Sequence, residues 1–153
     1  MSSLDSLYQQ IILDHSKQRL GEGLNDNQGH PSADNHQYNP TCGDEINLRV
    51  RLSENKQHIE NISWEGDGCS ISMASASVLS EMAQGLSIEE FNEMVEQFRQ
   101  LLRSRGTIEP DEELLGDAAA FAGVSRFVAR VKCAMLSWVA AEEAAKEAQL
   151  QNS

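Results

Sequence analysis

Two residue types that bind metal ions lie close together in the segment Asn-Pro-Thr-Cys-Gly-Asp at residues 39–44. Pro40 fixes one backbone dihedral and Gly43 permits a positive one, so the segment is typical of a turn. A turn of this kind can aim the thiol of Cys42 and the carboxyl of Asp44 at a common point. The segment therefore predicts part of a metal site or a reactive thiol.

The other two cysteines lie in different parts of the chain. Cys69 follows Gly66-Asp67-Gly68 and precedes a pattern of helical period, so we expect its sulfur near the positive end of a helix. That position favours the thiolate, the form that binds metals or attacks electrophiles. Cys133 falls within a predicted last helix, where Arg130 and Arg126 are expected on the same face.

Three cysteines and one aspartate would complete a tetrahedral metal site with ligands Cys42, Asp44, Cys69 and Cys133. Zn²⁺ accepts both thiolate and carboxylate ligands, so zinc is the metal that we expect. Four anionic ligands around one divalent ion leave a negative charge, which Arg130 and Lys132 can offset.

Two alternatives to a zinc site stay open at this point. Cysteine thiolates are also the usual ligands of iron-sulfur clusters, so a [2Fe-2S] cluster could occupy the same residues. Small buried cysteines are common in protein cores, and any one of the three could serve packing alone. Spacing does not show that the three segments meet.

Composition argues against a nucleic-acid partner. The chain has 12 Lys and Arg against 24 Asp and Glu, a formal net charge of −12. It lacks the basic surface that nucleic-acid binding requires, whereas a basic surface on a protein partner would be attracted.

The length fits one domain over residues 1–153. The first ten residues lack the charged and apolar regions of a secretory signal, and no stretch approaches the roughly 20 apolar residues that span a bilayer. We expect a cytoplasmic protein with no membrane partner. In that reducing compartment cysteines are more often metal ligands or reactive thiols than disulfides.

Apolar periodicity predicts the elements of the first half. A helix is expected over about residues 4–15, with His15 on its apolar face. We interpret His15 as a buried histidine that is held by hydrogen bonds rather than as a metal ligand. The segment 21–40 is rich in Gly, Asn and Asp, which favour loops, with a short strand near Tyr38.

Alternating apolar residues predict a hairpin after this loop. The strands cover about residues 46–52 and 61–65, and Ile59 is out of phase, which indicates either a bulge or the end of the strand pairing. The expected fold class is α+β, a small antiparallel three-stranded sheet with helices packed on it.

Helices dominate the second half. After Cys69 a helix is expected to Met82, and Ser87 with Glu90 forms a capping box for the next helix. An acidic linker over 103–123 is expected to be mostly irregular, with a short alanine-rich turn, before a last helix over about 125–149.

Three motifs together resemble the SufU family of the IscU-like scaffold superfamily. They are N-P-T-C-G-D at 39–44, E-G-D-G-C-S-I-S-M-A-S-A-S at 65–77 and A-R-V-K-C-A-M-L-S-W at 129–138. The resemblance covers nearly the whole chain with the motifs in the same order.

The resemblance implies a zinc-dependent sulfurtransferase of iron-sulfur cluster assembly with an IscU/SufU-like fold. It implies that zinc binds to Cys42, Asp44, Cys69 and Cys133, and that Arg130 lies beside the metal as a second catalytic residue. It also implies that Cys42 receives persulfide sulfur from a SufS-type cysteine desulfurase, one of whose histidines displaces Cys42 from zinc. Downstream iron-sulfur scaffold proteins would be the further partners.

Two features are similar to SufU rather than to the scaffold IscU. Lys132 stands where the scaffold branch has a histidine ligand, and lysine is a poor metal ligand at neutral pH. The linker 103–124 resembles an insertion of SufU-type proteins, while the chaperone-binding motif Leu-Pro-Pro-Val-Lys is absent. Val128 departs from the proline usual in SufU relatives, which affects the predicted start of the last helix and no ligand. A scaffold that assembles a [2Fe-2S] cluster and a purely structural zinc domain remain as alternatives.

Overall fold

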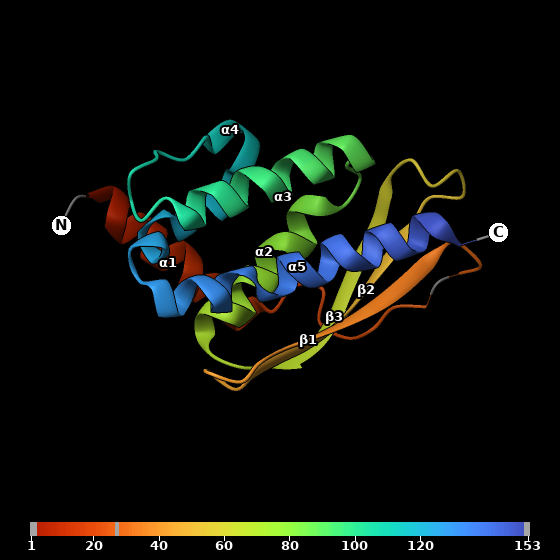
Figure 1. The fold of residues 1–153 in the computed structure, drawn as a ribbon, viewed down its shortest axis with the longest axis horizontal. Coiled ribbons are helices and arrows are strands. Elements are labelled where there is room, and N and C mark those ends of the chain that lie inside the picture. Colours follow the sequence, from red (N-terminus) through yellow and green to blue (C-terminus); the bar gives the residue numbers. More distant parts are fainter. Residues whose placement is uncertain (1–2, 27, 152–153) are drawn as a thin grey trace.

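The computed structural model describes residues 3–26 and 28–151. It has two layers, a three-stranded sheet and a group of helices on one of its faces (Figure 1). The elements in chain order are α1 Ser3–Gln18, β1 Ser32–Asn39, β2 Asp44–Leu52, β3 Ile59–Asp67, α2 Ser70–Ala83, α3 Ile88–Arg103, α4 Glu112–Leu115, the 3₁₀ helix η1 Gly116–Arg126 and α5 Val128–Leu150.

The sheet is antiparallel with the strand order β1-β2-β3, which confirms the predicted fold class. β2 alternates between buried and wetter residues, and its apolar side chains Ile46, Leu48 and Val50 are buried. The opposite face is polar, because Arg49 and Arg51 of β2 pair there with carboxylates on the neighbouring strands. No helix in the described residues is long and apolar enough to cross a bilayer.

β1 is longer than the short strand predicted near Tyr38. Its eight residues carry few apolar side chains, so alternation could not reveal it. Its place in the sheet comes from backbone pairing with β2, in a register that runs from Ser32 opposite Arg51 to Asn39 opposite Asp44.

Of the two interpretations of Ile59, the structure shows the bulge, because the strand pairing continues to this residue. Asn61 lies opposite Arg51, whereas Ile59 lies opposite Leu52, so Glu60 is the extra residue on β3. This extra residue returns Ile59 to the buried face, although it is out of phase in the sequence.

The capping box of α3 is also confirmed. The hydroxyl of Ser87 accepts a hydrogen bond from the N–H of Glu90, and the carboxylate of Glu90 accepts one from the N–H of Ser87. The apolar stripe that follows is buried, with Phe91 and Phe98 among its largest side chains.

The linker prediction was wrong in extent, because residues 112–126 are helical almost throughout. Ala118, Ala119, Ala120 and Phe121 of η1 are buried, and the Phe121 ring packs edge-on against Phe98 at 5.7 Å between centroids. The small side chains of these alanines form no clear apolar stripe, so the sequence pattern did not predict the full length of this element. α5 starts later than predicted, and Arg126 therefore belongs to η1 and not to the helix of Cys133, which corrects its predicted position.

One hydroxyl group inside the core links α5 to α2 by hydrogen bonds. The hydroxyl of Ser75 on α2 donates to the carbonyl of Ala134 at 2.6 Å and accepts from Trp138 Nε1 at 2.9 Å. The Trp138 ring stacks on Phe98 at 3.9 Å between centroids. Because Ala134 follows Cys133 directly, this contact also fixes the position of Cys133 relative to α2.

Substitution of Ser75 by Ala should reduce the free energy of unfolding by about 1–3 kcal/mol, because it leaves the indole N–H of Trp138 unpaired in the core and removes a hydrogen bond to the Ala134 carbonyl. Ser80→Ala is the matched control, since the Ser80 hydroxyl donates to the carbonyl of Ala76 in its own helix and, within the described residues, to no other element. Urea denaturation of both variants measures the difference. An equal loss of unfolding free energy in both variants would show that the hydrogen bonds of Ser75 between the helices add no stability beyond that of a bond within one helix.

Candidate metal centre

The turn between β1 and β2 exposes the side chain of Cys42 and directs that of Asp44 into the protein. The carbonyl of Asn39 accepts from Gly43 N at 2.8 Å, and its side-chain amide oxygen accepts from Thr41 N at 3.1 Å. Gly43 has a φ of +75°, the left-handed conformation that glycine adopts without a Cβ clash. The result is an exposed Cys42 and a fully buried Asp44 two residues later.

The Asp44 carboxylate links this turn to the start of α2. It accepts hydrogen bonds from Cys69 N at 2.9 Å and from Ser72 Oγ at 2.6 Å. Burial alone would raise the pKa of Asp44, but the hydrogen bonds from Ser72 and Cys69 outweigh this effect and hold the pKa below its ordinary value. Asp44 is therefore a buried anion at the N-terminus of a helix, where the helix dipole also favours it.

Cys69 occupies the cap position of α2, as predicted, and is partly exposed. Its sulfur lies 3.8 Å from Asp44 Oδ2 and 3.5 Å from Ser72 Oγ. The preceding residue, Gly68, leaves space for the carboxylate, because a Cβ there would lie 2.4 Å from Asp44 Oδ1. Sequence reasoning missed Ser72 and Gly68, although their spacing around Cys69 was visible in the second motif.

Cys133 brings the third sulfur to this point from α5. Its side chain is fully buried, and its thiol donates to Cys42 Sγ at an Sγ–Sγ distance of 3.1 Å. Burial raises the pKa of the Cys133 thiol well above its ordinary value, and the hydrogen bond to Cys42 acts in the same direction. In the absence of a cation this sulfur is therefore held as a thiol.

Three of the four predicted donors converge closely. One sulfur each from Cys42 and Cys133 and one carboxylate oxygen of Asp44 lie within 4.8 Å of one another, so these residues can hold a metal ion. Cys69 does not belong to this group of three. Its sulfur contacts the carboxylate of Asp44.

The two predicted cations lie at the surface. Arg130 and Lys132 are exposed on α5, three residues and one residue before Cys133. Among the described residues neither side chain forms an ion pair with Asp44, so the negative charge of the site faces no direct cationic partner.

His15 is buried, as the sequence indicated, and its two ring nitrogens are both engaged. Nδ1 lies 2.8 Å from Ser77 Oγ, and Nε2 lies 3.0 Å from Asp117 Oδ2. Together with Asp117 and Glu81, His15 forms a second group of possible metal donors. The hydrogen bonds explain His15 without a metal, because they join α1 to α2 and η1 and satisfy a buried polar ring.

The chain is similar in sequence to a known protein family and to characterised members of it. Residues 7–134 match the family described as NifU-like N terminal domain. The chain is 43% identical over 144 residues to the zinc-dependent sulfurtransferase SufU of Bacillus subtilis, covering 93% of this chain and 91% of that protein. It is 38% identical over 146 residues to the iron-sulfur cluster assembly scaffold protein IscU of Streptococcus pyogenes, covering 95% and 87%.

A solved structure shares the fold. The putative iron-sulfur cluster assembly scaffold protein for the SUF system from Fervidobacterium islandicum superposes with a TM-score of 0.73 at 30% identity, over 88% of this chain and 93% of that one. The resemblance to SufU and the IscU-like superfamily is thereby confirmed. The chain belongs to the NifU-like N terminal domain family.

Proposed function

We propose that this protein is a zinc-dependent sulfurtransferase of iron-sulfur cluster assembly. It takes persulfide sulfur onto Cys42 from a SufS-type cysteine desulfurase and delivers it to iron-sulfur scaffold proteins in the cytoplasm. The observation that carries the proposal is an exposed Cys42 sulfur beside a buried thiol and a buried carboxylate, within 4.8 Å of both donors. The similarity to a protein named zinc-dependent sulfurtransferase supports it.

The donor set fits zinc. Cys42 and Cys133, whose sulfurs lie 3.1 Å apart, would supply two thiolates to the ion. Asp44 and Cys69 complete the proposed four ligands. A bound zinc ion would stabilise the sulfurs as thiolates and offset the charge of the Asp44 carboxylate.

Sulfur transfer needs one accessible nucleophile, and Cys42 is the exposed cysteine. The Cys42 thiolate attacks the outer sulfur of the donor's persulfide, and the sulfur-sulfur bond of the donor breaks. Its electron pair leaves with the donor's cysteine, which becomes a thiolate, while Cys42 carries the persulfide. Arg130 lies on the same helix as Cys133. Its positive charge stabilises the negative charge that passes from the Cys42 thiolate to the donor's cysteine during this exchange.

A scaffold that assembles a [2Fe-2S] cluster on the same ligands is the second candidate. The similarity to a protein named as an IscU scaffold favours it. An anaerobic preparation that turns brown with iron and sulfide, and then transfers its cluster to an apo-protein, would support the scaffold. A colourless zinc protein that stimulates its desulfurase would support the sulfurtransferase.

Incubation with desulfurase and cysteine should add the mass of one sulfur atom to Cys42. Mass spectrometry of the intact protein and of the Cys42 peptide measures the adduct. Cys42→Ala should keep the fold, because the side chain is exposed, and should lose the adduct completely. Persulfide found on Cys69 or Cys133 of the wild-type protein, and none on Cys42, would contradict the assignment.

Substitution of Gly68 by Ala should weaken zinc binding without removing a ligand. The new methyl group would collide with Asp44 Oδ1 and displace the carboxylate. Gly123→Ala is the matched control, because a Cβ at Gly123 meets no atom within 4 Å. Competition with a chromophoric chelator measures both affinities, and we expect a loss of about tenfold or more for the first variant only. Equal affinities would remove Asp44 from the proposed ligands.

A further inference from the structure

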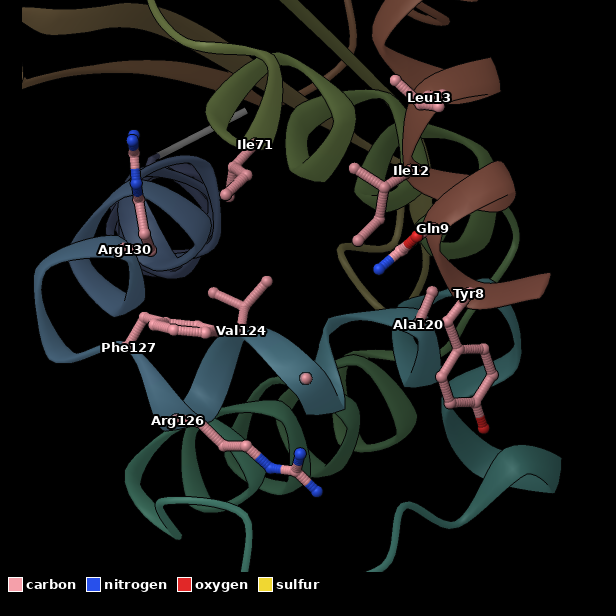
Figure 2. Close-up of a pocket in the computed structure, with 11 residues that line it drawn as sticks. Tyr8, Gln9, Ile12, Leu13, Ile71, Ala120, Val124, Arg126, Phe127 and Arg130 are labelled. Atoms are coloured by element: carbon pink, nitrogen blue, oxygen red, sulfur yellow. The ribbon is translucent and has the colours of Figure 1, made fainter. Parts of the chain in front are cut away.

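A hollow of about 590 Å³ lies among the helices (Figure 2). It is bounded by α1, the start of α2, η1 and the start of α5. Its lining is mainly apolar and includes Tyr8, Ile12, Leu13, Ile71, Val124 and Phe127. We name it the α1–α5 groove.

The groove leaves large apolar side chains in water. Phe127 is 63% exposed and Leu13 is 49% exposed, and they lie on opposite walls, as Figure 2 shows. A protein segment that lies across the groove can cover both, and aromatic side chains of this kind are enriched in protein interfaces.

The rim of the groove is basic, although the chain is strongly acidic. Arg126 and Arg130 belong to the lining, and both side chains are exposed. Within the described part of the chain neither guanidinium forms an ion pair. Figure 2 shows them pointing outward on different sides of the hollow. The whole chain carries a net charge of −12, which repels acidic surfaces, so these two cations mark where carboxylates of a partner can approach.

The groove adjoins two of the proposed ligands along the chain. Ile71 lies two residues after Cys69 at the start of α2, and Arg130 lies one helical turn before Cys133 on α5. A partner that occupies the groove therefore contacts the first turns of α2 and α5, the segments next to Cys69 and Cys133 in the chain.

We propose that the α1–α5 groove is the docking site of the protein that donates sulfur. An apolar side chain of the donor enters the groove, and aspartate or glutamate residues beside it pair with Arg126 and Arg130. The inference rests on the proposed function and adds the surface and the chemistry by which the donor is recognised.

Phe127 and Val128 provide a matched pair for the test. They are neighbours with nearly equal exposure, 63% and 61%, but only Phe127 lines the groove. Phe127→Glu should weaken binding to a purified SufS-type cysteine desulfurase about tenfold or more, as measured by isothermal titration calorimetry. Val128→Glu should stay within about twofold of wild type. Zinc content and the unfolding midpoint of each variant verify that fold and metal are intact.

A charge reversal tests the rim separately. Arg126→Glu should weaken desulfurase binding and flatten its dependence on salt concentration, because a charge pair with the partner is lost. Arg103→Glu makes the same charge change on an exposed residue of α3 outside the groove, and it should have little effect.

The outcomes separate this inference from the proposed function. If wild-type protein accepts no sulfur from the desulfurase, the proposed function fails. If it accepts sulfur but Phe127→Glu binds the desulfurase as tightly as Val128→Glu does, the docking proposal is overturned and the function stands. Unchanged desulfurase binding with lost delivery to an apo-scaffold protein also overturns it, because the groove would then serve the acceptor.

Discussion

The buried carboxylate of Asp44 ties together the parts of the chain that form the candidate metal centre. An ionised carboxyl group inside a protein is costly unless hydrogen bonds replace its water. Here Cys69 N and Ser72 Oγ supply them, and the absence of a side chain at Gly68 lets the carboxylate reach the helix. The turn that carries Cys42 is thereby joined, through Asp44, to the start of the helix that follows Cys69.

Core packing of its helix places the remaining sulfur, that of Cys133, near Asp44. α5 lies across the helix-covered face of the sheet (Figure 1) and is fixed to α2 through Ser75 and Trp138. The stack of Trp138 on Phe98 joins α3 to the same unit. Rigid elements hold donor atoms more precisely than loops do, and this support explains how a site assembled from distant segments can be preorganised.

Exposure divides the cysteines into different chemical positions. Cys133 is enclosed by the core, Cys69 is partly covered at a helix start, and Cys42 reaches solvent on a turn. Only an accessible sulfur can meet a second protein, whereas an enclosed one is protected from solvent. The apolar α1–α5 groove with its two arginines contrasts with the acidic net charge of the chain, and under the docking proposal this contrast would orient the partner.

The sequence by itself determined the elements with strong periodicity and the types of ligand. Alternation in β2, the stripe and capping box of α3, and the three cysteine motifs are local patterns, and local physics is enough to interpret them. It could not determine β1, whose polar side chains reveal nothing of its pairing, or η1, whose alanines are buried without forming a stripe. Only the tertiary structure decided that Cys42, Asp44 and Cys133 converge while Cys69 stays at the edge, and that Ser72 supports Asp44. These facts depend on how strands and helices pack, and contacts between residues far apart in the chain leave no local signal.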